Sequence, residues 1–72
     1  MRFADKLNKL RVQNGLTQEQ LAEHLHVARQ SVTKYEAGKG YPKIETIIDI
    51  AKFFDVSIDY LLLDDIEDVS KQ

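Results

Sequence analysis

The amino-acid sequence predicts an all-α domain of five helices, with two short helices joined by a tight turn near its middle. Apolar residues recur at helical spacing in five segments, and strict strand-like alternation is absent. Glycine, proline or a capping residue marks most of the boundaries between these segments. The chain has 72 residues, of which 43% are hydrophobic. This length suits one small domain, which we place at residues 1–63.

The first helix is predicted from Phe3 to Asn14. Phe3, Leu7 and Leu10 occupy the i, i+4 and i+7 positions of one helix face, which makes the segment amphipathic. Gly15 follows and ends it.

A capping box opens the second helix. Thr17 is followed three residues later by Gln20, and each side chain is expected to bond the other residue's backbone amide. Leu16 and Leu21 flank this cap as a hydrophobic staple, and the apolar stripe continues to Leu25.

The third helix is predicted from Ala28 to Ala37, with Gly38 at the left-handed position that ends it. Only His26 and Val27 separate it from the second helix, and so short a turn is the helix-turn-helix signature. Its outward face carries Arg29, Gln30, Thr33 and Lys34. Three of these four are long hydrogen-bonding side chains of the kind that read base edges in a major groove.

The inner side of the third helix carries Val32, Tyr35 and Glu36. Arg11 lies on the side of the first helix that should meet the bundle, so we expect a bidentate Arg11–Glu36 ion pair. The alternative is two independent solvated charges.

A loop follows Gly38, because two glycines and Pro42 fall within a few residues. Lys39, Tyr41 and Lys43 gather there beside the end of the third helix. We expect Lys39 to contact DNA phosphates and extend this expectation to Tyr41 and Lys43, with a solvated loop as the alternative.

Two further helices are predicted. The first spans residues 44–54 and is either the most buried helix or one that also contacts a partner, with the core as the expected role for most of it. The residues at helical spacing are Ile44, Ile47, Ile48, Ala51 and Phe54, and Ile50 and Phe53 widen the face. The second runs from the N-cap Ser57 to about Leu63. In it Ile58, Leu61 and Leu62 should reach the core and Tyr60 and Leu63 lie nearer the edge.

Charge is divided along the chain, whose formal net charge is −2. Residues 1–45 hold eight basic and five acidic side chains, whereas residues 46–72 hold two basic and seven acidic ones. The basic part contains the outward helix. Residues 64–72 form an acidic tail, expected either to be disordered or to extend the last helix.

Other classes of function have little support in the residues. There is no cysteine, and the two histidines are at i, i+2, which does not suit zinc. No nucleophile, histidine and acid form a constellation, so we expect neither an enzyme nor a cofactor. No apolar run reaches membrane-spanning length, and the expected location is the cytoplasm.

The chain resembles the phage-repressor and Cro type of helix-turn-helix regulators, also called the XRE family. The resemblance runs from Phe3 to Leu62 through LNKLR, GLTQEQLAEHL, VARQSVTKYEAGKGYP and IETIIDIAKFFDVSIDYLL, in the family's order and spacing. It implies a five-helix DNA-binding domain, encoded by a bacterium or a phage. Such domains usually bind a palindromic operator as homodimers and act as transcriptional repressors.

The resemblance also implies roles for particular residues. Arg29, Gln30 and Lys34 fall at base-contacting positions, with Ala28 and Thr33 beside them. Gln18, next to Thr17 at the start of the second helix, matches a phosphate-clamping glutamine. Lys39 matches a position near the DNA backbone, and Arg11 and Glu36 match a buried ion pair.

Two positions depart from the family pattern. His26 stands where a left-handed glycine is common, so some backbone strain is expected. Ala37 stands where the family often has an asparagine that contacts phosphate, and this contact is expected to be missing.

A competing hypothesis is a protein-interaction module, as in antitoxins of this family. The acidic last quarter of the chain motivates it, together with candidate exposed apolar residues. These are Phe53, Tyr60, Leu63 and Ile66.

Overall fold

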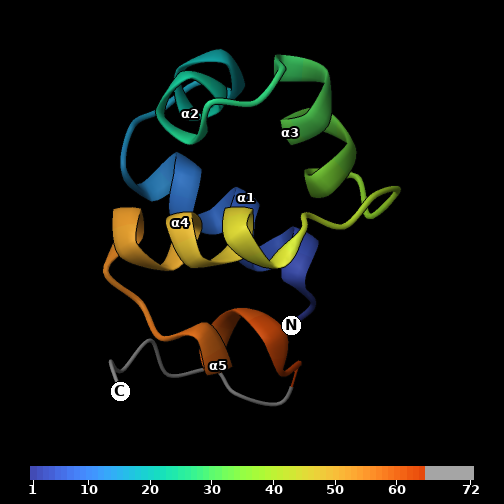
Figure 1. Cartoon of the computed structure of the whole chain (residues 1–72), viewed down its shortest axis with the longest axis vertical. Helices are drawn as coiled ribbons and strands as arrows, with labels where there is room; N and C mark the ends of the chain where they lie inside the picture. Colours follow the sequence, from blue (N-terminus) through green and yellow to red (C-terminus); the bar gives the residue numbers. More distant parts are fainter. Residues whose placement is uncertain (65–72) are drawn as a thin grey trace.

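Five α-helices follow one another along residues 1–64, which are the residues described by the structure, a computed structural model (Figure 1). The predicted all-α class with five helices is therefore confirmed, and the predicted boundaries hold to within two residues. The helices are α1 (Phe3–Gln13), α2 (Gln18–Leu25), α3 (Arg29–Glu36), α4 (Ile44–Phe54) and α5 (Ile58–Leu62).

Local chemistry sets the helix boundaries. The predicted capping box is present, because Thr17 Oγ1 accepts from the Gln20 amide at 3.0 Å and Gln20 Oε1 accepts from the Thr17 amide at 2.9 Å. The Ser57 hydroxyl likewise accepts from the Tyr60 amide at 2.9 Å and starts α5. Gly15, with φ of +69°, takes the left-handed turn after α1.

Each helix contributes to one core between the layers of the bundle. Figure 1 shows α1 and α4 across the middle of the molecule, with α2 and α3 on one side of them and α5 on the other. The α1 helix contacts both α3 and α5, whereas α4 contacts α2 and α5. The most deeply buried apolar side chain of each helix meets here: Leu7, Leu21, Val32, Ile50 and Leu61.

The predicted apolar face of α4 was wrong at its first residue. Ile44 is 54% exposed, whereas Ile47, Ile50 and Ala51 are buried. Ile44 begins the helix beyond the edge of the core, and Thr46 is buried one turn before Ile50. The buried face of α4 is therefore rotated away from Ile44 and toward Ile50. The apolar pattern alone did not predict this rotation, because Ile50 stands among other isoleucines.

The predicted orientation of α5 was also wrong. Tyr60 is only 3% exposed, although we expected it near the edge, and Leu62, expected in the core, is 38% exposed. The Tyr60 ring faces the ammonium of Lys6, whose nitrogen lies 4.5 Å from the ring centroid. Contact with a buried cation, rather than apolar spacing, explains why Tyr60 points inward.

Lys6 is a completely buried residue of α1, which the sequence pattern did not predict. Its Nζ donates to the backbone carbonyl oxygens of Tyr60 and Leu63, the latter at 2.7 Å. The last carbonyls of a helix lack partners within the helix, and a cation near that end is favourable. Lys6 therefore closes the end of α5 and holds it against α1.

The acidic tail lies almost wholly outside the described residues, because these end at Asp64. The domain boundary at residue 63 and the alternatives for residues 64–72 therefore stay predictions. In the part of the chain that is described, no helix is both long and apolar enough to cross a membrane.

Candidate nucleic-acid interface

The turn between α2 and α3 depends on a left-handed residue. His26 has φ of +58° and ψ of +41°, which confirms the expectation of a left-handed residue here. The chain then reverses so sharply that the Val27 amide donates to the Ala22 carbonyl oxygen at 3.0 Å. Histidine adopts this conformation at a higher energy than glycine would, so the turn carries local strain.

The outward face of α3 is exposed as predicted. Val32 is completely buried on the opposite side and fixes the rotation of the helix. Ala28 is the N-cap, and its side chain makes no capping bond. The exposed candidates for base contact are Ala28, Arg29, Gln30, Thr33 and Lys34.

The end of α3 directs Lys39 to the surface. Ala37 caps the helix, and Gly38 follows with φ of +72°. This turn lets the Lys39 amide donate to the Lys34 carbonyl oxygen at 3.0 Å. Lys39 is exposed, as is Lys34 on α3.

The predicted Arg11–Glu36 ion pair is present. Arg11 Nε donates to Glu36 Oε2 at 2.6 Å and Nη2 donates to Oε1 at 3.0 Å, while Nη1 bonds the Leu16 carbonyl oxygen. Burial alone would raise the pKa of Glu36. Hydrogen bonds from Arg11, Asn8 and Gln18 outweigh that effect and hold this pKa below its ordinary value. The hydrogen bond to Glu36 in turn raises the pKa of Arg11.

Glu36 also receives two amide donors, so the ion pair is part of a larger polar cluster. Asn8 Nδ2 donates to Glu36 Oε1 at 2.9 Å, and Gln18 Nε2 donates to the same oxygen at 3.1 Å. The sequence reasoning missed Asn8. A signal was available, because Asn8 precedes Arg11 by three residues and therefore shares its helix face.

Gln18 connects this cluster to the exposed face of α3. The Thr33 hydroxyl lies 2.7 Å from Gln18 Oε1 and 3.2 Å from the Arg29 carbonyl oxygen. A candidate phosphate-contacting residue and a candidate base-contacting residue are thus bonded to one another, and the bond from Gln18 to Glu36 links this pair to the ion pair.

Tyr41 and Lys43 are not part of the hydrogen-bonded group formed by Gln18, Thr33 and Glu36. The Tyr41 ring packs against Phe3, with centroids 4.9 Å apart, although Tyr41 is 58% exposed. Burial and the nearby charge of Asp64 raise the pKa of Tyr41. Lys43 is exposed at the N-cap of α4.

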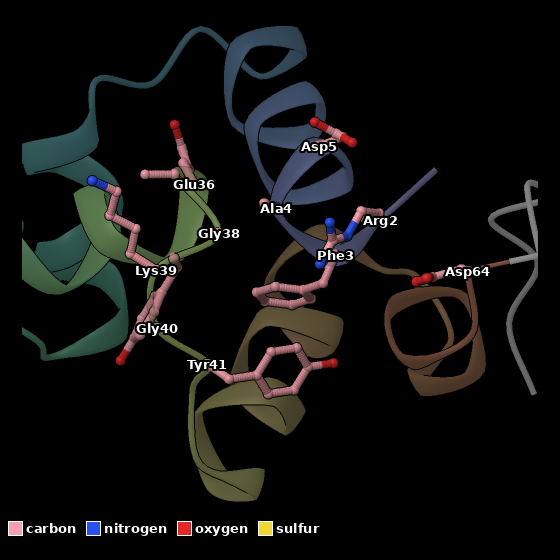
Figure 2. Close-up of a pocket in the computed structure, with 12 residues that line it drawn as sticks. Arg2, Phe3, Ala4, Asp5, Glu36, Gly38, Lys39, Gly40, Tyr41 and Asp64 are labelled. Atoms are coloured by element: carbon pink, nitrogen blue, oxygen red, sulfur yellow. The ribbon is translucent and has the colours of Figure 1, made fainter.

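A pocket of about 680 Å³ lies between the start of α1 and the loop after α3. Figure 2 shows the Phe3 and Tyr41 rings together there, while the Lys39 ammonium points away from both. The lining carries charges of both signs, Arg2 and Lys39 as well as Asp5, Glu36 and Asp64. This mixture does not make a site selective for phosphate.

Comparison with known proteins supports this description of the chain. A family model described as helix-turn-helix matches residues 7–61. The HTH-type transcriptional activator BcrR of Enterococcus faecalis is 55% identical over 62 residues, which are 86% of this chain and 30% of BcrR. The cryptic phage CTXphi transcriptional repressor RstR of Vibrio cholerae is 39% identical over 62 residues, which are 86% of this chain and 56% of RstR. The chain thus spans about a third to a half of the length of these relatives.

A solved structure extends the comparison to the fold. The P22 c2 repressor, crystallised with a synthetic operator, superposes with a TM-score of 0.84 at 22% identity, over 90% of this chain and 98% of that one. At this identity the likeness concerns the arrangement of the helices. The predicted fold of the phage-repressor DNA-binding domain is therefore confirmed. Together with the family match, this shows that the chain belongs to the helix-turn-helix family of the phage-repressor and Cro type, the XRE family.

Proposed function

We propose that this chain binds double-stranded DNA in a sequence-specific way and regulates transcription, with α3 lying in the major groove. The observation that carries the proposal is the exposed row of hydrogen-bonding side chains on α3, opposite the buried Val32. Arginine and lysine favour the O6 and N7 atoms of guanine, and glutamine favours adenine. Arg29, Lys34 and Gln30 supply these groups.

Phosphate contacts would come from both ends of the helix-turn-helix. Thr17 and Gln18 begin α2, where unpaired backbone amides and the helix dipole favour an anion. Lys39 follows α3 and is exposed. These local groups provide attraction to DNA despite the negative formal charge of the chain. Tyr41 and Lys43 stay in the proposal as outer contacts, since both are exposed.

The functional unit we propose is a homodimer on a palindromic operator in the cytoplasm of a bacterium, where it associates with the nucleoid. Two copies of α3 would lie about 34 Å apart, one turn of DNA. Bound over a promoter, the dimer would exclude polymerase and repress transcription. RstR, named a repressor, favours this sign of regulation, whereas the name of BcrR favours activation.

Selection of binding sites from random duplex DNA tests the proposal. We expect enriched sites with two inverted half-sites about 10 base pairs apart, centre to centre. Recovery of no enriched sequence would overturn sequence-specific binding, and enrichment of a single half-site would overturn the dimer. The matched control is the double variant Arg29→Ala/Gln30→Ala, which should lose the enrichment while keeping the helical circular dichroism spectrum.

A second candidate function is binding of a protein partner, as an antitoxin does. Phe53 is 41% exposed and stacks on His24 with ring centroids 4.6 Å apart, and Leu63 is 47% exposed. Tyr60 no longer supports this function because it is buried, and Ile66 lies outside the described residues. Stoichiometric co-purification of a protein with the wild-type chain, lost in Phe53→Ala, would favour this candidate over DNA binding alone.

A further inference from the structure

The Gln18 side chain has only one chemically consistent orientation. A carboxylate offers acceptors and no donor, so the Gln18 group 3.1 Å from Glu36 must be its NH₂. Turning the amide around would place two oxygens against each other. Gln18 Oε1 therefore faces Thr33, and the Thr33 hydroxyl donates to it at 2.7 Å.

With Gln18 in this orientation, the single hydroxyl proton of Thr33 is already used in a hydrogen bond within the protein. The bond to Gln18 is shorter than the 3.2 Å approach to the Arg29 carbonyl oxygen, and both acceptors lie within the protein. A base acceptor would have to compete with them. Thr33 is exposed on the same helix as the base-reading candidates, yet its donor already has a partner.

Gln18, by contrast, keeps a donor for an outside group. Its NH₂ carries two hydrogens, and Glu36 takes one. Among residues 1–64 no acceptor takes the other. Because Glu36 is itself held by Arg11 at 2.6 Å, the remaining N–H has a defined direction before any ligand binds.

We propose that Thr33 is a positioning residue, whose hydroxyl holds the Gln18 amide so that Gln18 donates its remaining N–H to a DNA phosphate. Thr33 then contributes to affinity for all sequences and not to the choice of base. This inference rests on the proposed function, and it replaces the expectation that Thr33 contacts a base.

Two variants of the full chain separate the hydroxyl from the shape of the side chain. Thr33→Val removes the donor and keeps the branched shape, whereas Thr33→Ser keeps the donor and removes the methyl. Threonine, valine and serine have similar helix propensities, so α3 should persist in both. The probes are the duplex recovered by selection with the wild-type chain and an unrelated duplex of the same length.

We expect Thr33→Val to weaken binding to both duplexes about two- to tenfold, the usual range for one lost hydrogen bond. Thr33→Ser should bind like the wild type, and adding Thr33→Val to Gln18→Ala should cause no further loss. Wild-type affinity in Thr33→Val, equal weakening in Thr33→Ser, or a changed preference at one base pair would each overturn the proposal.

Measurement on the free protein separates this inference from the proposed function. The nitrogen relaxation of the Gln18 side-chain amide should report an ordered group in the wild type and in Thr33→Ser, and a mobile one in Thr33→Val. An amide that is equally mobile in all three overturns the positioning role. If the amide is ordered but selection with the wild-type chain recovers no duplex, the hydrogen bond stands and the proposed DNA-binding function fails.

Discussion

Arg11 of α1 and Glu36 of α3 are joined by two hydrogen bonds, of 2.6 Å and 3.0 Å, across 25 residues of sequence. Only 15% of the Arg11 side chain and 5% of the Glu36 side chain are exposed. The pair therefore ties the helix with the candidate base contacts to a helix outside the helix-turn-helix. Its geometry bears on stability and on the direction in which α3 presents its side chains.

Arg11→Ala should lower the free energy of unfolding by about 2–3 kcal/mol, because it leaves the Glu36 carboxylate without its cation. Urea unfolding followed by circular dichroism measures this loss. Val12→Ala is the matched control, since Val12 is the next residue and is 58% exposed. That control should change stability by less than about 0.5 kcal/mol. A similar small effect of Arg11→Ala would contradict an energetic role for the pair.

Low pH should lower the free energy of unfolding of the domain, because the Glu36 carboxylate takes up a proton. Its pKa in the folded chain lies below its ordinary value, so its stabilising contribution is complete at pH values above that ordinary value. The contribution falls as pH drops toward the folded-state pKa and the carboxyl takes up a proton. We expect the stability difference between the wild type and Glu36→Gln to be constant above about pH 5 and to shrink below about pH 4. A difference that does not vary with pH would contradict this assignment.

Lys6→Met should loosen α5 selectively. The substitution keeps an unbranched side chain but leaves the Tyr60 and Leu63 carbonyl oxygens without the Lys6 donor, which costs about 1–3 kcal/mol. Amide hydrogen exchange should accelerate more in α5 than in α2. Lys9→Met, at an exposed position of the same helix, is the control and should leave exchange in α5 unchanged. If the hydrogen-exchange protection of α5 were unaltered in Lys6→Met, Lys6 would not hold the end of α5 against α1.

His26→Gly should leave stability unchanged or raise it by up to about 1 kcal/mol, because relief of the left-handed strain is partly offset by greater freedom of the unfolded chain. Glu23→Gly, inside α2, should lower stability by roughly 0.5–1 kcal/mol. Thermal unfolding compares the two variants. Destabilisation of the same size by both would show that the turn stores no strain at His26.

Arg29→Ala and Lys39→Ala should affect DNA binding in different ways. Loss of Arg29 should relax the preference at one base pair, with about 1–3 kcal/mol less discrimination. Loss of Lys39 should weaken binding to every duplex and reduce the slope of log affinity against log salt by about 1. Binding isotherms at several salt concentrations, on the selected duplex and its single-base variants, measure both effects. Identical behaviour of the two variants would contradict the division of roles.

Most of the fold was predictable from patterns among residues that are close together in the sequence. The Thr17 capping box, the left-handed Gly38 and the Ser57 cap involve residues close in sequence, and the structure has all of them. Helical spacing also placed the outward face of α3 correctly. Spacing placed Arg11 and Glu36 on the inner sides of their helices but left two solvated charges as the alternative, and the family resemblance favoured the ion pair that the structure has.

The errors came from contacts between residues distant in sequence. Lys6 and Tyr60 are 54 residues apart, and nothing in either local pattern predicts that a lysine is buried over a tyrosine ring. The same contact rotated α5 away from the predicted orientation. In the site, the Thr33–Gln18 bond was missed because periodicity places side chains on faces but does not give the direction of their donors.

The α1 helix is held by polar contacts to both α3 and α5, and this has a consequence for how the domain unfolds. Its Arg11 and Asn8 hold Glu36 of α3, and its Lys6 holds the end of α5. Detachment of α1 breaks both sets of contacts at once and exposes Leu7 from the core. The first helix therefore has no low-energy route to fraying on its own, and its central amides should exchange with solvent only when the whole domain opens cooperatively.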